Sequence, residues 1–398
     1  MNDITSLRIS TLEKLIRDRK FRDSFNESVD RAIVFIDSGF SGKKLLESLN
    51  AGASISQQIV EIAKARVSSR VRFSGWNRIW LDRFSSKYAT PEEISRYRSR
   101  RITDSEILDI GSGSGLQAIF LSLSGRNKVT GIERDPVRFY LSILNSIEME
   151  ASEVSFKMGD FFRVDLSTFI KKDMVVYSDP LRIPGPGHKE IDSLVPSPVK
   201  VMQKFSDITK NFCFDLPPTL SPSEVGISGE KEYISVNHTL KRLTLYTGDL
   251  RKSETSAVLL PEGREFRGMP DDQELAISEP SSYIYVADPA IVRAGLIQAI
   301  LKGGESKVIH SDHRRTILSS SVMESDFPGE TYQVIGRCDK DRAKELLINS
   351  DAGKVILRYS LNSEEYYGLR ENFERGLTGS KTVYIFEVKG LLLLAEKL

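Results

Sequence analysis

The sequence predicts an α/β protein in which a seven-stranded, largely parallel sheet follows a helical region and precedes a small α+β domain. Three observations support this prediction. Apolar residues recur at three-to-four spacing over residues 1–100, as in amphipathic helices. From Glu106 onward, short β-branched runs alternate with amphipathic stretches, which is typical of strand–helix units. Beyond Tyr283, shorter helices and strands alternate in a pattern that indicates a separate unit.

The length of the chain indicates more than one domain. It has 398 residues, more than the roughly 250–300 that one hydrophobic core usually serves. We expect a helical region over residues 1–100, an α/β domain over 101–270 and an α+β domain over 280–398. Residues 262–282 are rich in Glu, Gly, Pro, Asp and Ser, as linkers are. The hydrophobic and charged fractions, 40% and 28%, exclude a disordered or fibrous chain.

The expected elements follow one another with Gly or Asp-Pro at the breaks. In the α/β domain, strands are expected at Ile107–Ile110, Lys128–Ile132, Val154–Met158, Met174–Tyr177, Phe212–Phe214, Tyr233–Val236 and Leu243–Thr247, with helices from Leu116 and over Pro136–Met149. In the last domain, Asp288 is expected to cap a helix over Ile291–Leu301. Further strands are expected over Lys354–Tyr359 and on both sides of the Lys389-Gly390 turn.

Nothing in the sequence marks the protein for a membrane or for export. The N-terminus lacks a basic segment followed by an apolar stretch, and the longest aliphatic run, Leu391–Leu394, is far shorter than a membrane span. The two cysteines, Cys213 and Cys338, cannot form a disulfide framework, and no Cys/His cluster has metal-ligand spacing. We therefore expect a cytoplasmic protein that holds no metal.

A glycine-rich turn follows the first expected strand of the sheet. The run from Asp109 to Gly115 joins that strand to a helix, where glycines let the backbone approach a bound nucleoside. A dinucleotide fingerprint would need a glycine three residues after Gly113, but position 116 is leucine. The turn therefore predicts a Rossmann-like nucleoside site without a pyrophosphate cradle. Its expected binding residues are Asp109, Gly111, Ser112, Gly113 and Gly115.

Two further acids follow the next two strands. Glu133 ends the second strand, 24 residues after Asp109, where a carboxylate can accept both hydroxyls of a ribose. Asp160 follows the third strand and is placed to accept from an adenine amino group, while Phe161 can pack on the adenine ring. Turn chemistry explains one acid at a strand end, but three in succession favour a nucleoside site. We assign Glu133, Arg134, Asp160 and Phe161 to it.

The glycine turn is similar to the first motif of class I methyltransferases, in which the acid and the glycine loop hold the methionine end of the cofactor. This resemblance implies S-adenosyl-L-methionine (SAM) as cofactor. The fourth strand ends at Asp179-Pro180-Leu-Arg182, at the same edge of the sheet. Methyl transfer from a sulfonium is an in-line displacement, so the protein must mainly orient the acceptor. We therefore expect Asp179, Pro180 and Arg182 to form the catalytic site, with Asp179 orienting the acceptor.

The residues after Asp179 narrow the chemistry. Enzymes that methylate exocyclic base amines usually carry Pro-Pro and an aromatic residue here, whereas this chain has Leu181 and Arg182. Uridine ring-carbon methyltransferases have a similar Asp-Pro-x-Arg run but need a nucleophilic cysteine, and Cys213 lies in an apolar strand. Covalent activation of a base is therefore not expected.

Two nearby residues leave alternatives open. His188 lies in a Pro/Gly-rich loop that either closes over substrate or is a surface loop, and the surface loop is favoured. Asp215, after the fifth strand, is either a second acid of the pocket or a structural residue.

Four segments together resemble the prokaryotic class I methyltransferases that end in a THUMP-like domain. They are Asp109–Gly115, Glu133, Asp179–Arg182 and Tyr285–Gly295. The resemblance covers roughly residues 70–398 and implies a Rossmann-like methyltransferase domain followed by a THUMP-like α+β domain. Members are usually taken to be RNA methyltransferases because true THUMP domains bind tRNA. RNA, with tRNA as one candidate, is therefore the acceptor that the resemblance implies.

A basic segment supports RNA at the level of residues. Residues 64–101 hold 11 Lys/Arg and three acids, a local excess of 11 − 3 = +8 in a chain of net charge +1. Rings at positions 76, 80, 84, 88 and 97 are interleaved with these cations and can stack on unpaired bases. The i, i+4 spacing of the first four favours the alternative that they form the buried face of one helix. A second cluster, His310-Ser-Asp-His313-Arg314-Arg315, either extends an RNA surface or is simply solvated.

Two other functions stay open at this point. The methyl acceptor is alternatively a protein or a small molecule. The chain is alternatively a module that binds SAM or RNA without transferring a methyl group.

Overall fold

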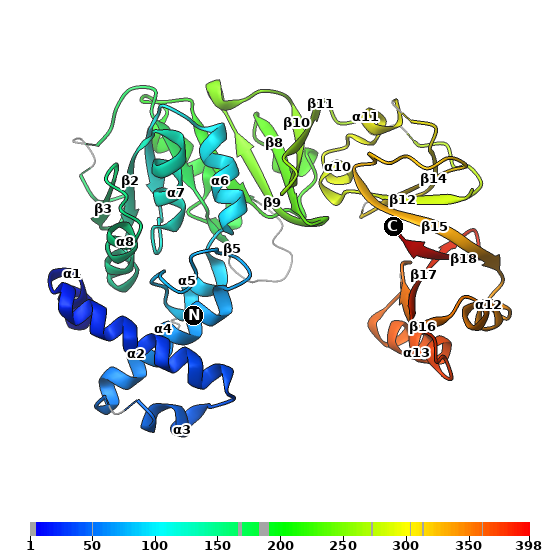
Figure 1. The fold of residues 1–398 in the computed structure, drawn as a ribbon. Helices are drawn as coiled ribbons and strands as arrows, with labels where there is room; N and C mark the ends of the chain where they lie inside the picture. Colours follow the sequence, from blue (N-terminus) through cyan, green and yellow to red (C-terminus); the bar gives the residue numbers. More distant parts are fainter. Residues whose placement is uncertain are drawn as a thin grey trace. The chain divides into compact units, whose positions relative to one another are not determined.

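The computed structural model describes residues 5–49, 51–165, 169–182, 191–271, 274–302, 304–312, 314–359 and 361–398. The chain, drawn as a ribbon in Figure 1, divides into two compact units: Met1–Leu216 with Leu245–Arg251 form unit 1, and Pro217–Thr244 with Lys252–Leu398 form unit 2. The expected division into three parts at about residues 100 and 270–280 stays a prediction.

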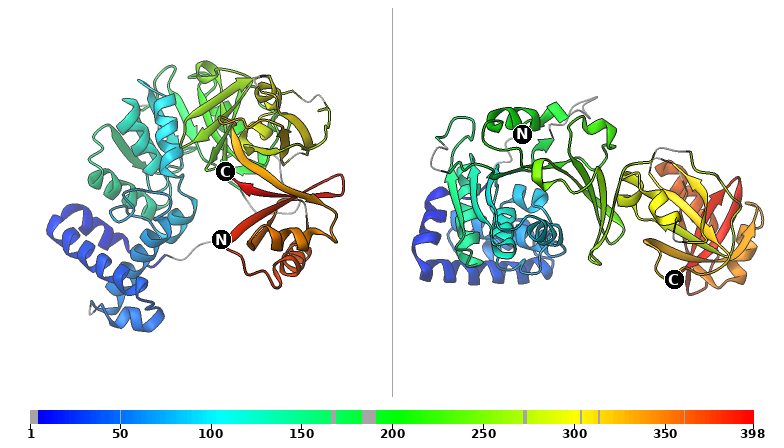
Figure 2. Two further views of the ribbon diagram at one scale, coloured as in Figure 1. Left: turned by 45° about the vertical axis from the view of Figure 1, so that its right-hand side comes forward. Right: turned by 90° about the horizontal axis from the view of Figure 1, so that it is seen from above.

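Helices precede the sheet in unit 1. They are α1 (Ile9–Arg17), α2 (Arg19–Asp37), α3 (Gly42–Glu47), α4 (Ala53–Ser69), α5 (Arg83–Tyr88) and α6 (Glu92–Arg101). Their apolar faces bury Leu12, Val29 and Ile62 in one core. Asp18 caps α2, because its side chain accepts a hydrogen bond from Phe21 N at 3.0 Å. Figure 2 shows the dark-blue helices as one group, and α1 of that group contacts α8 (Pro136–Glu148).

The prediction that the aromatic stretch forms one helix face is wrong. Residues 70–82 form turns and extended backbone, and α5 begins only at Arg83. Trp80 is nevertheless fully buried. The side chain of Asn145 accepts from Trp80 N at 2.7 Å and donates to Trp80 O at 2.9 Å. These tertiary hydrogen bonds satisfy the backbone of a buried segment that is not helical.

Nine strands form the main sheet, in the order β11-β10-β8-β9-β7-β4-β1-β2-β3. They are β1 (Glu106–Ile110), β2 (Lys128–Glu133), β3 (Val154–Met158), β4 (Val175–Ser178), β7 (Phe212–Leu216), β8 (Glu230–Val236), β9 (Thr239–Tyr246), β10 (Thr255–Leu260) and β11 (Arg264–Gly268). β1 pairs in parallel with β2 on one side and with β4 on the other. The strand order reverses between β1 and β4, and open α/β sheets bind ligands at such a switch point.

Further elements connect these strands. They are α7 (Leu116–Gly125) and α8 (Pro136–Glu148), which match the expected helices, the short pair β5 (Leu181–Arg182) and β6 (Leu194–Val195), α9 (Pro198–Phe205), and the 3₁₀ turns η1 (Ile191–Ser193), η2 (Ser223–Val225) and η3 (Gly248–Leu250). α7 contacts both α6 and α8 (Figure 1). Asp135 caps α8 by accepting from Arg138 N at 3.1 Å, with Pro136 as its first residue.

The expected count of seven strands in this sheet is too low. β10 pairs in parallel with β8, and β11 pairs antiparallel with β10. β11 lies inside residues 262–282, so the prediction of a linker is wrong for that part. β11 is an edge strand with one neighbour, so it tolerates polar residues such as Arg264 and Glu265. These polar residues hide the apolar pattern by which a strand is recognised in a sequence.

Unit 2 also contains a second sheet of seven strands, in the order β13-β14-β12-β15-β18-β17-β16. Its elements are β12 (Tyr283–Ala287), α10 (Pro289–Arg293), α11 (Ile297–Leu301), β13 (Lys307–Ser311), β14 (Thr316–Ser320), β15 (Gly329–Cys338), α12 (Ala343–Asn349), β16 (Ala352–Leu357), α13 (Ser363–Glu374), β17 (Lys381–Val388) and β18 (Leu391–Lys397). The side chain of Asp288 caps α10 as expected, accepting from Ala290 N at 2.9 Å. The single helix expected over Ile291–Leu301 is instead two helices, because Gly295 takes a left-handed conformation at φ +69°.

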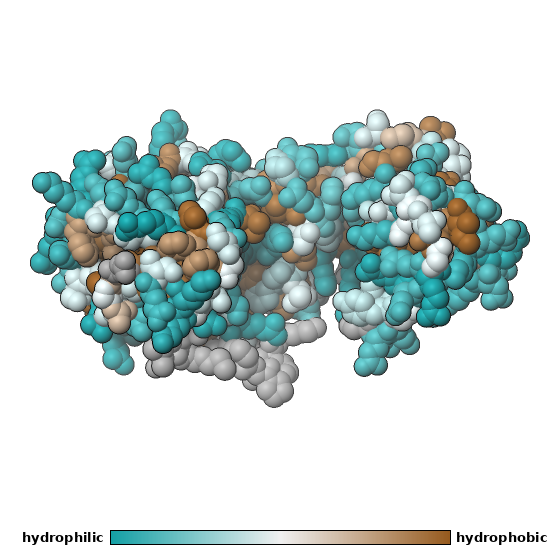
Figure 3. Space-filling view, turned by 60° about the horizontal axis from the view of Figure 1, so that its bottom comes forward, coloured by the Kyte–Doolittle hydropathy of each residue, from teal (hydrophilic) through white to brown (hydrophobic). Residues whose placement is uncertain are grey.

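Among the described residues, no helix is long and apolar enough to cross a membrane. The face in Figure 3 is covered mainly by hydrophilic residues, with apolar residues in small groups. Cys213 and Cys338 are both buried thiols.

Candidate functional site

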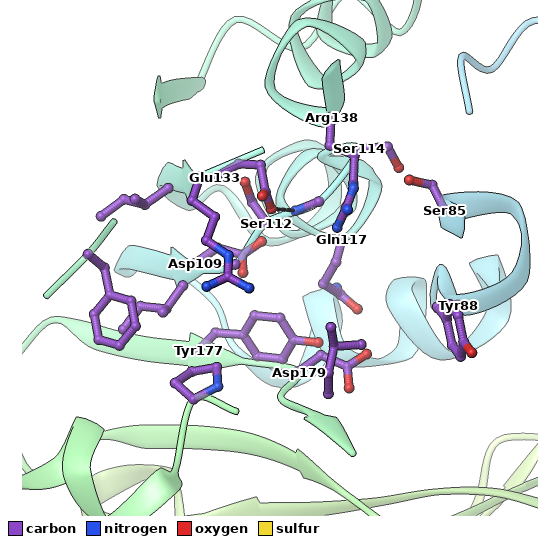
Figure 4. Close-up of a pocket in the computed structure, with 18 of the residues that line it drawn as sticks. Ser85, Tyr88, Asp109, Ser112, Ser114, Gln117, Glu133, Arg138, Tyr177 and Asp179 are labelled. Carbon is purple, nitrogen blue, oxygen red and sulfur yellow. Dashed lines mark hydrogen bonds between the residues drawn. The ribbon is translucent and has the colours of Figure 1, made fainter. Parts of the chain in front are cut away.

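A pocket of about 250 Å³ opens in unit 1 at the switch point of the sheet. Its walls come from the turn after β1, the carboxyl ends of β2, β3 and β4, helix α5, and residues 195–196. Figure 4 shows Asp109 and Glu133 on one side, Ser85 and Tyr88 on the other, and Tyr177 and Asp179 below. The pocket therefore gathers side chains from segments about 100 residues apart in the sequence.

The glycine turn takes the conformation that its residues allow. Gly113 has φ +56°, and its N–H donates to Glu133 Oε2 at 2.8 Å. Gly115 has φ +79°, and a Cβ there would lie 2.6 Å from Phe156 and Ser142. A side chain at either position would strain the turn, and at Gly115 it would also separate α7 from the sheet. Gly111, Ser112 and Gly113 all line the pocket, whereas Gly115 supports it from behind.

Glu133 is held firmly at the end of β2. Its Oε1 accepts from Asp135 N at 2.7 Å, and its Oε2 accepts the Gly113 bond. The residue is only 5% exposed, and it lines the pocket. Each carboxylate oxygen has a second lone pair, so the carboxylate keeps capacity for a ligand's hydroxyl groups.

Five pocket residues have a buried polar atom without a hydrogen-bond partner among the described residues, namely Ser85, Asp109, Ser112, Gln117 and Arg138. Two of these atoms are of opposite kinds: Oδ2 of Asp109 is an acceptor, and Nε2 of Gln117 is a donor. Burial and the nearby carboxylates of Asp179 and Glu133 raise the pKa of Asp109 to about 8. A buried unsatisfied polar group costs about 1–3 kcal/mol, so the pair marks a place where a ligand supplies the missing partners.

A buried network fixes the orientation of Gln117. Its Oε1 accepts from the guanidinium of Arg98 and from Ser95 Oγ at 3.2 Å, so Nε2 is the atom left for the pocket. Arg98 also forms an ion pair with Asp215 and donates to Tyr177 Oη at 3.1 Å. Burial alone would lower the pKa of Arg98, but Asp215 holds it well above its ordinary value. Asp215 is absent from the pocket lining, so its position agrees with the structural alternative.

Asp160 and Phe161 lie where the third strand ends. Asp160 Oδ1 accepts from Phe162 N at 2.9 Å, and the residue lines the pocket. The ring of Phe161 is buried, and its centroid lies 4.0 Å from that of Phe162, which also lines the pocket. Arg134 is exposed and lines the same side. The structure thus brings every predicted cofactor residue into or directly behind one pocket.

The predicted catalytic residues divide into two groups. Asp179 is half-buried and lines the pocket beside Leu181. Pro180 is buried and Arg182 is exposed, and neither is part of the lining. β5 and β6 pair antiparallel, which brings Val195 opposite Leu181. His188 lies outside the described residues.

Helix α5 supplies a wall that sequence reasoning missed. Phe84, Ser85 and Tyr88 line the pocket, and the two rings lie 4.6 Å apart. The guanidinium of Arg138 lies 4.3 Å from the centroid of the Phe84 ring. The i, i+4 spacing of Phe84 and Tyr88 belongs to the run of rings that predicts one buried helix face, whereas both residues lie on the short helix α5 and line the pocket.

The fold is shared with a solved structure. A crystal structure of a protein from Porphyromonas gingivalis W83, provisionally described as a methyltransferase, aligns with a TM-score of 0.74 over 94% of this chain and 98% of that chain. The two sequences are 17% identical. This chain has the fold of that protein.

Two other solved structures align over shorter parts. One is an RNA methyltransferase from Salinibacter ruber in complex with S-adenosyl-L-homocysteine, at 19% identity, 41% of this chain, 95% of that chain and a TM-score of 0.28. The other is M. capricolum TrmK in complex with the same compound, at 10% identity, 41% of this chain, 70% of that chain and a TM-score of 0.30. No family model matches the sequence, and no curated protein does.

Most arginines of the basic segment over residues 64–101 contact other parts of the protein. Seven of its arginines contact carboxylates or carbonyl oxygens of other residues, namely Arg66, Arg70, Arg72, Arg78, Arg96, Arg98 and Arg101. Arg66 and Arg98 are fully buried. These two arginines therefore do not contribute to an RNA surface. The exposed cations of the segment are Lys64, Arg78, Arg83, Lys87, Arg96 and Arg100.

Proposed function

We propose that this protein is an enzyme that transfers a methyl group from SAM to an acceptor. The observation that carries the proposal is the pair of opposite, unsatisfied groups in the pocket, Oδ2 of Asp109 and Nε2 of Gln117. The amino-acid end of SAM has an ammonium group and a carboxylate. An acceptor and a donor, both buried, match these two charges.

The remaining cofactor residues fit the nucleoside end. Glu133, fixed by two backbone N–H groups, would hold the ribose hydroxyls. Phe161 and Phe162 give an apolar wall for the adenine ring, with Asp160 beside them to accept from its amino group. The backbone of Gly111 and Gly113 would lie along the methionine end, where a Cβ would project into open space.

Charge also favours a cationic cofactor. The pocket is lined by Asp109, Glu133 and Asp179, and their mutual repulsion adds to the effect of burial on the pKa of Asp109. SAM carries two positive charges, on the sulfonium and the ammonium groups. A bound cation would lower the pKa of Asp109 and let the three carboxylates stay ionised together.

Asp179 is placed to act on the acceptor. SAM supplies an activated methyl group on its sulfonium. The half-buried carboxylate of Asp179 would accept a hydrogen bond from the N–H or O–H of the acceptor, orient its lone pair and take up the proton that it loses. Leu181, Val195 and Tyr88 would exclude water from this end of the pocket.

We propose RNA as the acceptor class, on narrower grounds than the whole basic segment. α5 has exposed Arg83 and Lys87 next to Phe84 and Tyr88, whose rings line the pocket. Cations beside rings suit a base that enters the pocket while its phosphates stay outside. The exposed Arg134 adds a further cation at the pocket.

Calorimetry tests the cofactor part of the proposal. SAM should bind the wild-type protein and fail to bind Glu133→Ala, because that variant removes the ribose acceptor and releases Gly113. Glu153→Ala is the matched control, since Glu153 is exposed. Normal SAM binding by Glu133→Ala would refute the site assignment.

RNA binding tests the acceptor part. The affinity for single-stranded RNA should fall with salt, and the slope of log K against log salt should shrink by roughly 0.7 for each cation removed in Arg83→Gln and Lys87→Gln. Lys43→Gln, on α3, is the control with an exposed lysine. A slope unchanged in both variants would point instead to a protein or small-molecule acceptor.

A further inference from the structure

A second pocket lies within unit 2, beside the second sheet. Its volume is about 280 Å³. It is lined by three arginines, one histidine, one glutamate, one tyrosine and several apolar residues, namely Arg314, Arg315, Arg358, His238, Glu330, Tyr359, Val286, Ala287, Pro289, Ile317, Leu357 and Phe386. The basic cluster noted in the sequence at Arg314 and Arg315 thus contributes to a cavity; His313 lies outside the described residues.

Positive charge exceeds negative charge around this pocket. Glu330 is the acid of its lining, and it already contacts Arg358 and Lys397, the latter at 2.6 Å. Asp312 lies 3.9 Å from Arg315 and 3.2 Å from His310. Glu330 therefore serves two cations, while the lining holds three guanidinium groups, which favours a bound anion.

Two arginines are held close together. Arg315 donates to the carbonyl oxygen of Arg358 at 2.6 Å, which fixes its guanidinium against the residue that follows β16. Burial lowers the pKa of Arg315, the charge of Asp312 opposes this, and the charge of Arg358 lowers the pKa further. A bound anion would relieve this like-charge repulsion.

A hydroxyl group in the pocket has no hydrogen-bond partner in the part of the chain that the structure describes. Tyr359 Oη is buried and forms no hydrogen bond with any of the described residues. Burial raises the pKa of Tyr359 to about 12, so the hydroxyl keeps its proton at neutral pH and is a donor. His238, which also lines the pocket, is fixed by a 3.0 Å contact between its Nδ1 and Asp288 Oδ2.

From these contacts we infer that the pocket binds a phosphate group carried by a small organic ligand of the nucleotide class. Guanidinium groups match phosphate oxygens geometrically, and the hydroxyl of Tyr359 supplies a further donor. Leu357 and Phe386 give an apolar wall for the rest of the ligand. The source of the phosphate is either a free mononucleotide or the terminal nucleotide of an RNA.

Calorimetry with the full-length protein tests this inference. The probes are adenosine 5′-monophosphate, adenosine, and a short RNA with either a 5′-phosphate or a 5′-hydroxyl. Saturating S-adenosyl-L-homocysteine is present to fill the pocket in unit 1. The binding of S-adenosyl-L-homocysteine, measured in the same samples, reports on the proposed function separately, because the two pockets lie in different units.

The variants separate binding from folding. Tyr359→Phe removes only the buried, unsatisfied hydroxyl, so the protein should unfold at the same temperature or higher while phosphate binding weakens about ten-fold. Arg315→Gln should weaken it at least as much. Arg337→Gln, an exposed arginine of β15 outside the pocket, is the control.

Each outcome decides the inference. Loss of phosphate binding in Tyr359→Phe and Arg315→Gln, but not in Arg337→Gln, supports it. If the inference holds, equal affinity for the monophosphate and the phosphorylated RNA identifies a free nucleotide as the ligand. Affinity for the phosphorylated RNA alone identifies the end of an RNA as the ligand. The inference is overturned if no phosphorylated probe binds, if adenosine binds as well as its monophosphate, or if all three variants bind alike.

Discussion

Replacing Asp109 by asparagine should stabilise the ligand-free protein while it weakens binding of SAM. Asp109 is 2% exposed, and burial and two nearby carboxylates raise its pKa from 3.8 to about 8. A carboxyl group whose pKa is higher in the folded state destabilises the fold above its unfolded pKa. The penalty grows by about 1.4 kcal/mol per pH unit from 3.8 and levels off near pH 8.

The raised pKa of Asp109 sets how large the stability gain of Asp109→Asn should be and how it should depend on pH. The penalty is about 1.5 kcal/mol at pH 5 and about 4 kcal/mol at pH 7, and it vanishes below pH 4. Asp109→Asn keeps the shape of the side chain and cannot ionise, so the stability gained should rise over the same window. Urea and thermal unfolding at pH 5 and pH 7 measure the difference. Asp23→Asn, an exposed acid on α2, is the control.

The same variant should lose affinity for the cofactor. A charge-assisted hydrogen bond to an ammonium group contributes about 1.5–3 kcal/mol, which corresponds to roughly 10–100-fold in affinity. In the wild-type protein, SAM should bind more tightly as the pH rises towards 8, because binding needs the ionised form of Asp109. A stability gain that is absent, or equal at pH 5 and pH 7, would refute this account of the residue.

Three further variants test other parts of the site. Gln117→Leu should weaken SAM binding about ten-fold but leave binding of decarboxylated SAM unchanged; equal losses for both compounds would contradict a carboxylate contact. Asp179→Asn should keep SAM affinity and lower kcat by about 100-fold or more, as single-turnover methyl transfer would show, and an unchanged rate would remove Asp179 from the mechanism. Arg98→Met should destabilise the protein by about 3–5 kcal/mol in urea unfolding, because Asp215 is left buried without its ion pair; a change below 1 kcal/mol would contradict that.

Much of the cofactor side of the site could be predicted from the sequence, for a geometric reason. Parallel strands end at one edge of the sheet, so acids that follow successive strands must come close together. Asp109 and Glu133 lie at the carboxyl ends of β1 and β2, Asp160 follows β3, and all three line one pocket. The glycine turn was equally visible, since Gly113 and Gly115 need positive φ.

The rest depends on tertiary contacts that no local pattern carries. Gln117 resembles any helical glutamine in the sequence, and its bonds to Ser95 and to Arg98, 19 residues earlier, leave its amide nitrogen for the pocket. Trp80 was expected on a helix face, but Asn145 satisfies its backbone from 65 residues away. The arginines of the basic segment suggested an RNA surface, although Arg66 and Arg98 proved to be buried. Charge counts in a sequence cannot separate solvated cations from those that hold the fold.

The central claim is that this protein moves a methyl group from SAM to an acceptor in the pocket beside Asp179. The most direct measurement is transfer of labelled methyl from SAM into an extract of cells that lack the gene, followed by division of the extract into nuclease-treated, protease-treated and low-molecular-weight portions. The account predicts label that nuclease releases with the wild-type protein and almost none with Asp179→Asn. No label in any portion, despite normal SAM binding, would contradict the claim of catalysis, and label only in protein or small molecules would contradict RNA as the acceptor.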